Sequence, residues 1–120
     1  MATIFVVDDE VMTVQMLTAL LKLMGHETTG AHTARQALGM IEHVNPDVIM
    51  LDIMLPDVNG LQLCQELRTI PALASTPIFM ISAIAPPRVT EAYEAGANGY
   101  ISKPLTLNEI RSALSSVGIR

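Results

Sequence analysis

The chain has one cysteine among its 120 residues, few basic side chains and no long apolar run. A lone cysteine cannot form an intramolecular disulfide or supply a cysteine-rich zinc site. Seven basic residues stand against twelve acidic ones, and this net charge of −5 is unfavourable for direct binding of nucleic acid. No apolar run approaches the length of a membrane span, and the one in the N-terminal MATIFVVDDE is too short for a signal peptide. We therefore expect a cytoplasmic protein in which this domain contacts neither nucleic acid nor membrane.

Apolar residues, by contrast, are abundant: they make up half of the chain, while charged residues make up only 16%. This composition supports a buried core and argues against a disordered tail. The length matches one domain, and no linker, repeat or low-complexity segment divides it. We expect residues 1–120 to form a single domain.

The apolar pattern changes its period repeatedly along the chain. Short runs that are apolar or rich in β-branched residues predict strands at residues 3–7, 26–31, 48–51, 77–81 and 100–102. Stripes with a spacing of three or four residues predict helices at residues 10–24, 33–45, 61–67, 86–95 and 106–117. Two of these helices begin with capping boxes, Thr33 with Gln36 and Thr106 with Glu109. Because strands that alternate with helices pair in parallel, the sequence predicts an α/β fold with a doubly wound, five-stranded parallel sheet.

Polar side chains directly follow four of the predicted strands. Asp8 and Asp9 follow the first strand, Asp52 the third, Ser82 the fourth and Lys103 the fifth. Ligands of such sheets bind beyond the carboxyl ends of the strands, so we expect these side chains to converge. Clustered carboxylates need positive charge, which Lys103 and a hard cation with oxygen ligands, such as Mg²⁺, would supply. A carboxylate in this setting is suited to attack phosphorus, with the serine hydroxyl as a hydrogen-bond donor.

Separated motifs in the same order identify a resemblance to a known family. The segments VVDDE, IMLDIMLPDVNG, FMISA and AGANGYISKPL resemble the receiver domain of two-component response regulators, and the resemblance covers nearly the whole chain. It implies the flavodoxin-like strand order 2-1-3-4-5. It also implies that Asp52 is the phosphorylated residue. Asp9, Asp52 and the backbone carbonyl of Met54 would bind Mg²⁺ directly, and Asp8 would act mainly through water.

The resemblance also implies how the domain responds to phosphorylation. Ser82 would be the hydroxyl that moves toward the phosphoryl group, Tyr100 the aromatic switch, and Lys103 the cation that pairs with the phosphate. The resemblance also implies a cis peptide bond between Lys103 and Pro104. The sequence alone would predict a trans bond there, because most bonds before proline are trans.

The function implied is a phosphorylation-activated signalling switch of a two-component system. A sensor histidine kinase or a histidine phosphotransfer protein would supply the phosphoryl group from a phosphohistidine, and the chain would transfer it to its own Asp52. The added charge would then shift a partner-binding surface through Ser82 and Tyr100, for an output domain or a downstream protein. Such a domain is not an enzyme in the usual sense, since it catalyses phosphoryl transfer to, and hydrolysis from, only its own residue.

Other functions fit the residues less well. An aspartyl-phosphate phosphatase of the haloacid-dehalogenase type needs a second acid two residues after the nucleophile, where this chain has Met54. A flavodoxin-like carrier of a phosphorylated cofactor presents backbone amides to the phosphate, which Asp8, Asp9 and Glu10 would repel. A receiver-like scaffold that is never phosphorylated has no need of the full set of site residues.

Some positions depart from the family's pattern, but none of them touches the phosphorylation chemistry. DNA-binding members often carry two acids before the switch aromatic, where this chain has Asn98 and Gly99. Those acids help to form salt bridges in a dimer through the fourth and fifth helices, so their absence argues against that dimer. The residue after the Lys-Pro pair, often phenylalanine, is Leu105, and Asn59 replaces the usual acid before the loop glycine.

The first predicted helix offers a candidate docking surface for the kinase. Its apolar stripe comprises Met12, Met16, Leu17, Leu20, Leu21 and Met24. We expect the stripe, centred on Leu20, to face the sheet. Val11 and Val14 lie off it, so we expect both to be partly exposed and to contact the kinase.

Overall fold

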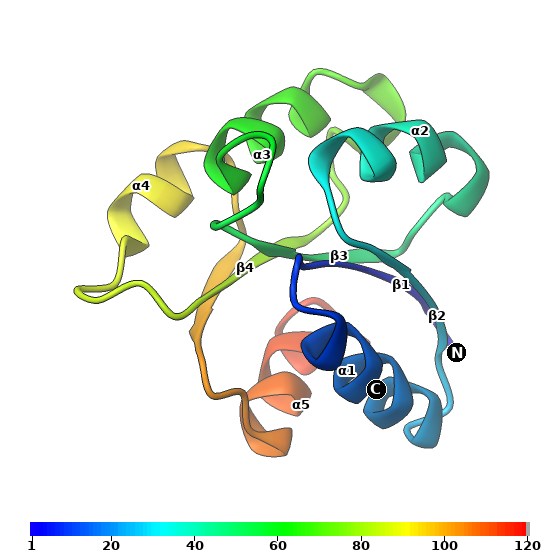
Figure 1. The fold of residues 1–120 in the computed structure, drawn as a ribbon. Helices are drawn as coiled ribbons and strands as arrows, with labels where there is room; N and C mark the ends of the chain where they lie inside the picture. The colour runs from blue at the N-terminus through cyan, green and yellow to red at the C-terminus, as the bar shows by residue number, and fades with distance from the viewer. Residues whose placement is uncertain (120) are drawn as a thin grey trace.

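The computed structural model describes residues 1–119 and has a central parallel sheet (Figure 1). Its strands are β1 (Thr3–Val7), β2 (Glu27–Ala31), β3 (Val48–Asp52), β4 (Ile78–Ser82) and β5 (Gly99–Ser102). They pair in parallel in the order β2-β1-β3-β4-β5. The predicted fold class and strand order are therefore confirmed.

Helices cover both faces of the sheet. They are α1 (Val11–Leu23), α2 (Ala34–Val44), α3 (Gly60–Arg68), α4 (Val89–Glu94), α5 (Leu107–Ser116) and the short 3₁₀ helix η1 (Pro71–Leu73). Figure 1 shows α1 and α5 on one face, and α2, α3 and α4 on the other. The part of the chain that the structure describes contains no helix with the length and apolar character to cross a bilayer.

The core is divided into two clusters by the sheet, because successive side chains of a strand point to opposite faces. In β1, Ile4 and Val6 join the cluster under α1 and α5, whereas Phe5 and Val7 join the cluster under α2, α3 and α4. The central strands β1, β3 and β4 are almost wholly buried, which explains their continuously apolar sequences.

The structure corrects the prediction for α1. The buried side chains of this helix are Val14, Leu17 and Leu21, while Met12 is 81% exposed and Met16 is 40% exposed. Val14 is buried because Gly30 of β2 leaves room for it: a Cβ on Gly30 would lie 2.5 Å from a Val14 methyl group. The expected exposure of Val14 is wrong, whereas that of Val11 is confirmed.

The predicted N-caps of α2 and α5 are confirmed, whereas the predicted start of α4 is wrong. The Thr33 hydroxyl accepts from the Gln36 N–H at 3.0 Å. The Thr106 hydroxyl accepts from the Glu109 N–H at 3.2 Å and donates to Glu109 Oε1 at 2.9 Å. The fourth helix was expected from residue 86, but α4 begins at Val89. Residues 86 and 87 are prolines that lie in the preceding turn, where the Ala85–Pro86 bond is cis. The Lys103–Pro104 bond is also cis, as the resemblance implied.

Candidate functional site

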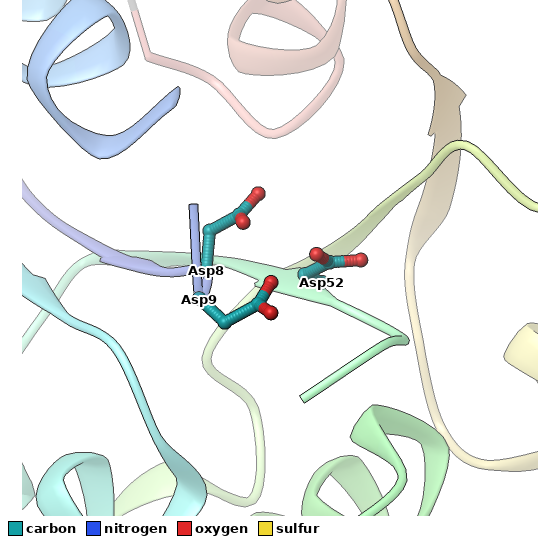
Figure 2. Close-up of side chains that lie close together, drawn as sticks. All are labelled: Asp8, Asp9 and Asp52. Atoms are coloured by element: carbon teal, nitrogen blue, oxygen red, sulfur yellow. The ribbon is translucent and has the colours of Figure 1, made fainter. Parts of the chain in front are cut away.

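Three aspartates lie together where two neighbouring strands end. β1 and β3 pair directly, so Asp8 and Asp9, which follow β1, lie beside Asp52, the last residue of β3. One carboxylate oxygen from each aspartate lies within 4.8 Å of the others (Figure 2). Asp8 and Asp52 are buried, whereas Asp9 is exposed. The structure therefore brings these predicted residues together, with one face of the cluster open to solvent.

Lys103 supplies the positive charge of this cluster. The residue follows β5, and its backbone N–H donates to the carbonyl of Ser82 at 2.8 Å, which fixes it beside β4. Its Nζ lies 2.8 Å from Asp8 Oδ2, 2.9 Å from Glu10 Oε1 and 3.3 Å from Asp52 Oδ2. The ammonium thus bridges carboxylates that would otherwise repel one another.

Glu10 is a site residue to which the sequence assigned no role. Its side chain is 62% exposed, and it hydrogen-bonds Lys103 from a position 93 residues away. This hydrogen bond holds the pKa of Glu10 below its usual value. The only sequence signal was its place beside the aspartate pair, which does not reveal that its side chain turns toward Lys103.

Burial has the largest influence on the acidity of Asp52. Burial and the charge of Asp8 raise the pKa of Asp52, the Met54 N–H and Lys103 partly offset them, and the net result is a pKa of about 6. Burial alone would lower the pKa of Lys103, but its short contacts to Asp8 and Glu10 and the charge of Asp52 outweigh it, so the pKa of Lys103 lies above its usual value. The site therefore holds a firmly charged cation against a carboxylate of reduced acidity.

The donor set fits a magnesium ion. The candidate donors are carboxylate oxygens and the Met54 backbone carbonyl, and oxygen ligands suit a hard cation. The three carboxylate oxygens lie within 4.8 Å of one another, which is comparable to the distance of about 4.2 Å between opposite ligands of octahedral magnesium. The Asp8 Oδ2 atom is buried and has no aligned hydrogen-bond donor, although the Lys103 ammonium lies 2.8 Å away. A cavity of about 210 Å³ adjoins the cluster and is lined by Asp9, Glu10, Asp52, Met54, Ala83 and Lys103. An ion and a phosphoryl group could both enter here.

Ser82 and Tyr100 are engaged with the segment between β4 and α4. Ser82 is buried, and its Oγ accepts from the Ile84 N–H at 3.0 Å. Tyr100 is half-buried, and its hydroxyl oxygen accepts from the Arg88 N–H at 3.3 Å. Both predicted switch residues therefore contact the segment that leads into α4.

Asp57 is a second residue whose contacts sequence reasoning missed. The sequence placed it only in a turn, but its two carboxylate oxygens accept from the Ala34 and Arg35 N–H groups, each at 2.9 Å. These bonds hold the pKa of Asp57 below its usual value. No local pattern could reveal them, because the partners lie 23 and 22 residues away.

Comparison with known proteins gives a consistent result. Residues 4–115 match the family described as the response regulator receiver domain. The DNA-binding response regulator MtrA of Mycobacterium tuberculosis is 37% identical over 108 residues, which are 89% of this chain and 46% of MtrA. The chain spans about half the length of the curated relatives it matches.

Solved structures resemble the whole chain. The chemotaxis response regulator CheY4 of Vibrio cholerae superposes with a TM-score of 0.90 at 29% identity, covering 98% of both chains. A two-component response regulator from Clostridium difficile has a TM-score of 0.90 at 25% identity, covering 98% of this chain and 95% of its own. The similarity therefore extends over sequence, fold and strand order.

Proposed function

The chain belongs to the family of response regulator receiver domains, and on this premise we propose that it is a phosphorylation-dependent signalling switch with Asp52 as its phosphoacceptor. One observation carries the proposal. Asp52 ends the central strand with its carboxylate buried, 3.3 Å from the Lys103 ammonium and beside two further aspartates. This is the environment that a carboxylate nucleophile toward phosphorus needs.

The transfer step follows from these positions. A carboxylate oxygen of Asp52 attacks the phosphorus of a phosphohistidine on the partner protein. The new oxygen–phosphorus bond forms as the nitrogen–phosphorus bond breaks, and the electron pair returns to the imidazole nitrogen, which takes up a proton from water. Lys103 lies close enough to pair with the phosphoryl oxygens, and this stabilises their charge in the transition state.

Asp9, Asp52 and the backbone carbonyl of Met54 would hold magnesium directly, and Asp8 would act mainly through water. Bound magnesium supplies positive charge that neutralises phosphoryl oxygens. The convergence of the three aspartates and the fit of their oxygens support this assignment.

The conformational response runs through Ser82 and Tyr100. When Ser82 Oγ turns toward a phosphoryl group on Asp52, it gives up its hydrogen bond from Ile84. That change acts on the segment that leads to Arg88, whose N–H is bound to Tyr100. The surface around α4 and β5 then changes for an output domain or a downstream protein.

The partner that supplies the phosphoryl group is a sensor histidine kinase or a histidine phosphotransfer protein, which acts on this domain in the cytoplasm. The chain would catalyse transfer to, and hydrolysis from, its own Asp52 only. The relatives have different outputs, since MtrA is described as DNA-binding and CheY4 as a chemotaxis regulator. We assign neither output to this domain.

Phosphorylation by a small donor tests the proposal. With acetyl phosphate and Mg²⁺, intact-protein mass spectrometry should detect one added phosphoryl group on the wild-type chain. Asp52→Asn should abolish the addition, and Asp47→Asn, which alters an exposed aspartate outside the site, should leave it unchanged. An unmodified wild-type chain would favour a scaffold, and a modified Asp52→Asn chain would exclude Asp52 as the acceptor.

A further inference from the structure

Asp57 joins two segments that are far apart in the sequence. It lies in the loop of residues 53–59 between β3 and α3, and its carboxylate faces the N-terminus of α2. Oδ1 accepts from Ala34 and Oδ2 from Arg35, both at 2.9 Å. The first N–H groups of a helix have no partner within the helix, so the loop itself provides acceptors for α2. Two charge-assisted hydrogen bonds make this a firm attachment.

The remainder of this loop is attached to β3 and α3. The Gly60 N–H donates to the Ile53 carbonyl at 2.6 Å, and Met54 forms an isolated β-bridge with Asn59. Asn59 Oδ1 accepts from the Leu61 N–H at 2.7 Å and so caps α3. Asp57 adds the attachment to α2.

The same loop begins at the phosphorylation site. The Met54 N–H donates to Asp52 Oδ1 at 3.1 Å, and Met54 lines the cavity beside the aspartates. Asp57 lies only three residues further along the chain. A shift of the loop therefore changes the position of the Met54 backbone and its hydrogen bond to Asp52.

We propose that Asp57 is a positioning residue for the phosphorylation site: it anchors the loop to α2 and so holds the Met54 backbone where the metal and the phosphoryl group require it. The inference rests on the proposed function and deepens it. It makes α2 a support of the site, although the helix contributes no residue to the acidic cluster.

The coupling between the Asp57 contact and magnesium binding must be reciprocal. If the Asp57 contact strengthens magnesium binding, magnesium binding must strengthen the Asp57 contact by the same factor. The Ala34 and Arg35 amides, which are the donors of this contact, should therefore exchange their hydrogens more slowly when Mg²⁺ is added. If Asp57 stabilised only α2, magnesium would not slow exchange at these amides by more than it slows exchange across the whole chain.

The principal experiment is a magnesium titration of the melting temperature at constant ionic strength. The stabilisation grows as RT ln(1 + [Mg²⁺]/Kd), and the fitted Kd is the half-saturating Mg²⁺ concentration of the folded chain. Asp57→Ala should raise the half-saturating Mg²⁺ concentration about fivefold or more, the lower end of typical coupling between sites. Thr33→Ala is the matched control, because Thr33 caps the same helix but has no bond to the loop. It should lower the melting temperature and leave the half-saturating concentration unchanged. Asp57→Asn, which keeps one acceptor oxygen, should fall between wild type and Asp57→Ala.

The outcomes separate the inference from the proposed function. A wild-type chain whose melting temperature rises with Mg²⁺, together with an unchanged half-saturating concentration in Asp57→Ala, would overturn the inference alone. Equal increases in Asp57→Ala and Thr33→Ala would also overturn it, since general loosening of α2 would then be the cause. A wild-type chain that neither responds to Mg²⁺ nor accepts a phosphoryl group would overturn the proposed function and the inference with it.

Discussion

Lys103 is the residue on which the charge balance of the site depends. Its ammonium lies within 3.3 Å of carboxylates from Asp8, Glu10 and Asp52, and Asp8 is completely buried. A buried carboxylate that loses its cation keeps the cost of desolvation and gains nothing in return. The lysine therefore has a structural role in addition to its proposed role in phosphoryl transfer.

We predict that Lys103→Met lowers the free energy of unfolding by about 3 kcal/mol in the presence of a chelator. It should also enlarge the stabilisation by Mg²⁺, because the acidic cluster becomes more negative when the ammonium is removed. Urea denaturation with EDTA and with Mg²⁺ measures both effects, and Lys22→Met on the exposed side of α1 is the control. A smaller magnesium effect in Lys103→Met would show that the lysine assists the ion rather than competing with it.

Asp57 should give the chain a dependence of stability on acid pH. Its pKa lies below the ordinary value of 3.8 in the folded chain, because the ionised carboxylate accepts from Ala34 and Arg35. The carboxylate therefore stabilises the fold above its ordinary pKa, and this contribution is lost as the pH falls through the lower, folded-state pKa. The melting temperatures of wild type and Asp57→Asn should differ at neutral pH and converge in acid. A constant difference from about pH 7 to about pH 3 would contradict this.

Among the site residues, those at strand ends could be predicted and those held by tertiary contacts could not. The convergence of Asp8, Asp52 and Lys103 follows from strand boundaries and from the rule that ligands bind at one edge of a parallel sheet. The contact of Glu10 with Lys103 and that of Asp57 with α2 depend on loop conformations that no local spacing encodes. The place of Ser82 at the site also follows from its strand end, whereas the switch roles of Ser82 and Tyr100 came from family resemblance alone.

At the scale of the element, α1 explains why periodicity can mislead. The helix carries two apolar stripes, the buried Val14, Leu17 and Leu21 and the exposed set that includes Met12 and Met16. Both stripes have helical spacing, so the pattern cannot reveal which one packs against the sheet. Gly30 decides the outcome, since its missing side chain admits Val14. The start of α4 was also ambiguous in the sequence. Proline can occupy the first turn of a helix, but here the two prolines lie in the segment before α4.

Val14 is buried, so it cannot contact the kinase as expected, and the exposed stripe of α1 that includes Met16 is the better candidate. Met16 lines a cavity of about 450 Å³ together with Lys103, Pro104 and Leu105, next to the acidic cluster. We predict that Met16→Glu slows phosphoryl transfer from a phosphorylated histidine kinase about tenfold, the effect of losing about 1.4 kcal/mol of docking energy. Transfer from acetyl phosphate, which needs no docking, should keep its rate.

The same helix offers a control for this experiment. Leu23 is 88% exposed at the far end of α1, so Leu23→Glu should leave both rates unchanged. Equal slowing with both donors in Met16→Glu would indicate damage to the site instead of lost docking. Val14→Glu is unsuitable for this purpose, because a buried charge at that position would destabilise the fold.

At the scale of the molecule, the two ends of α4 are held very differently. At the C-terminal end, the Arg68 guanidinium donates to the Gly96 carbonyl at 2.9 and 2.8 Å and to Asn98 Oδ1 at 2.8 Å. At the N-terminal end, the Arg88 N–H donates to the Tyr100 hydroxyl at 3.3 Å, and the helix has no side-chain cap. The fold therefore combines a fixed end with a loosely held one, and the loosely held end follows the segment that Ser82 contacts.

We predict that phosphorylation changes α4 at its N-terminal end only. Amide hydrogen exchange at Arg88 and Ala92, whose N–H groups are hydrogen-bonded to the Tyr100 hydroxyl and the Arg88 carbonyl, should become about tenfold faster with acetyl phosphate and Mg²⁺, which corresponds to about 1.4 kcal/mol of local stability. Exchange at residues 95–98 should keep its rate, because the Arg68 hydrogen bonds are independent of Ser82. In Asp52→Asn neither region should respond, whereas in Arg68→Ala the response should spread to residues 95–98. Equal acceleration at both ends of the wild-type helix would mean that α4 moves as a whole, and that the Arg68 network does not fix its C-terminal end.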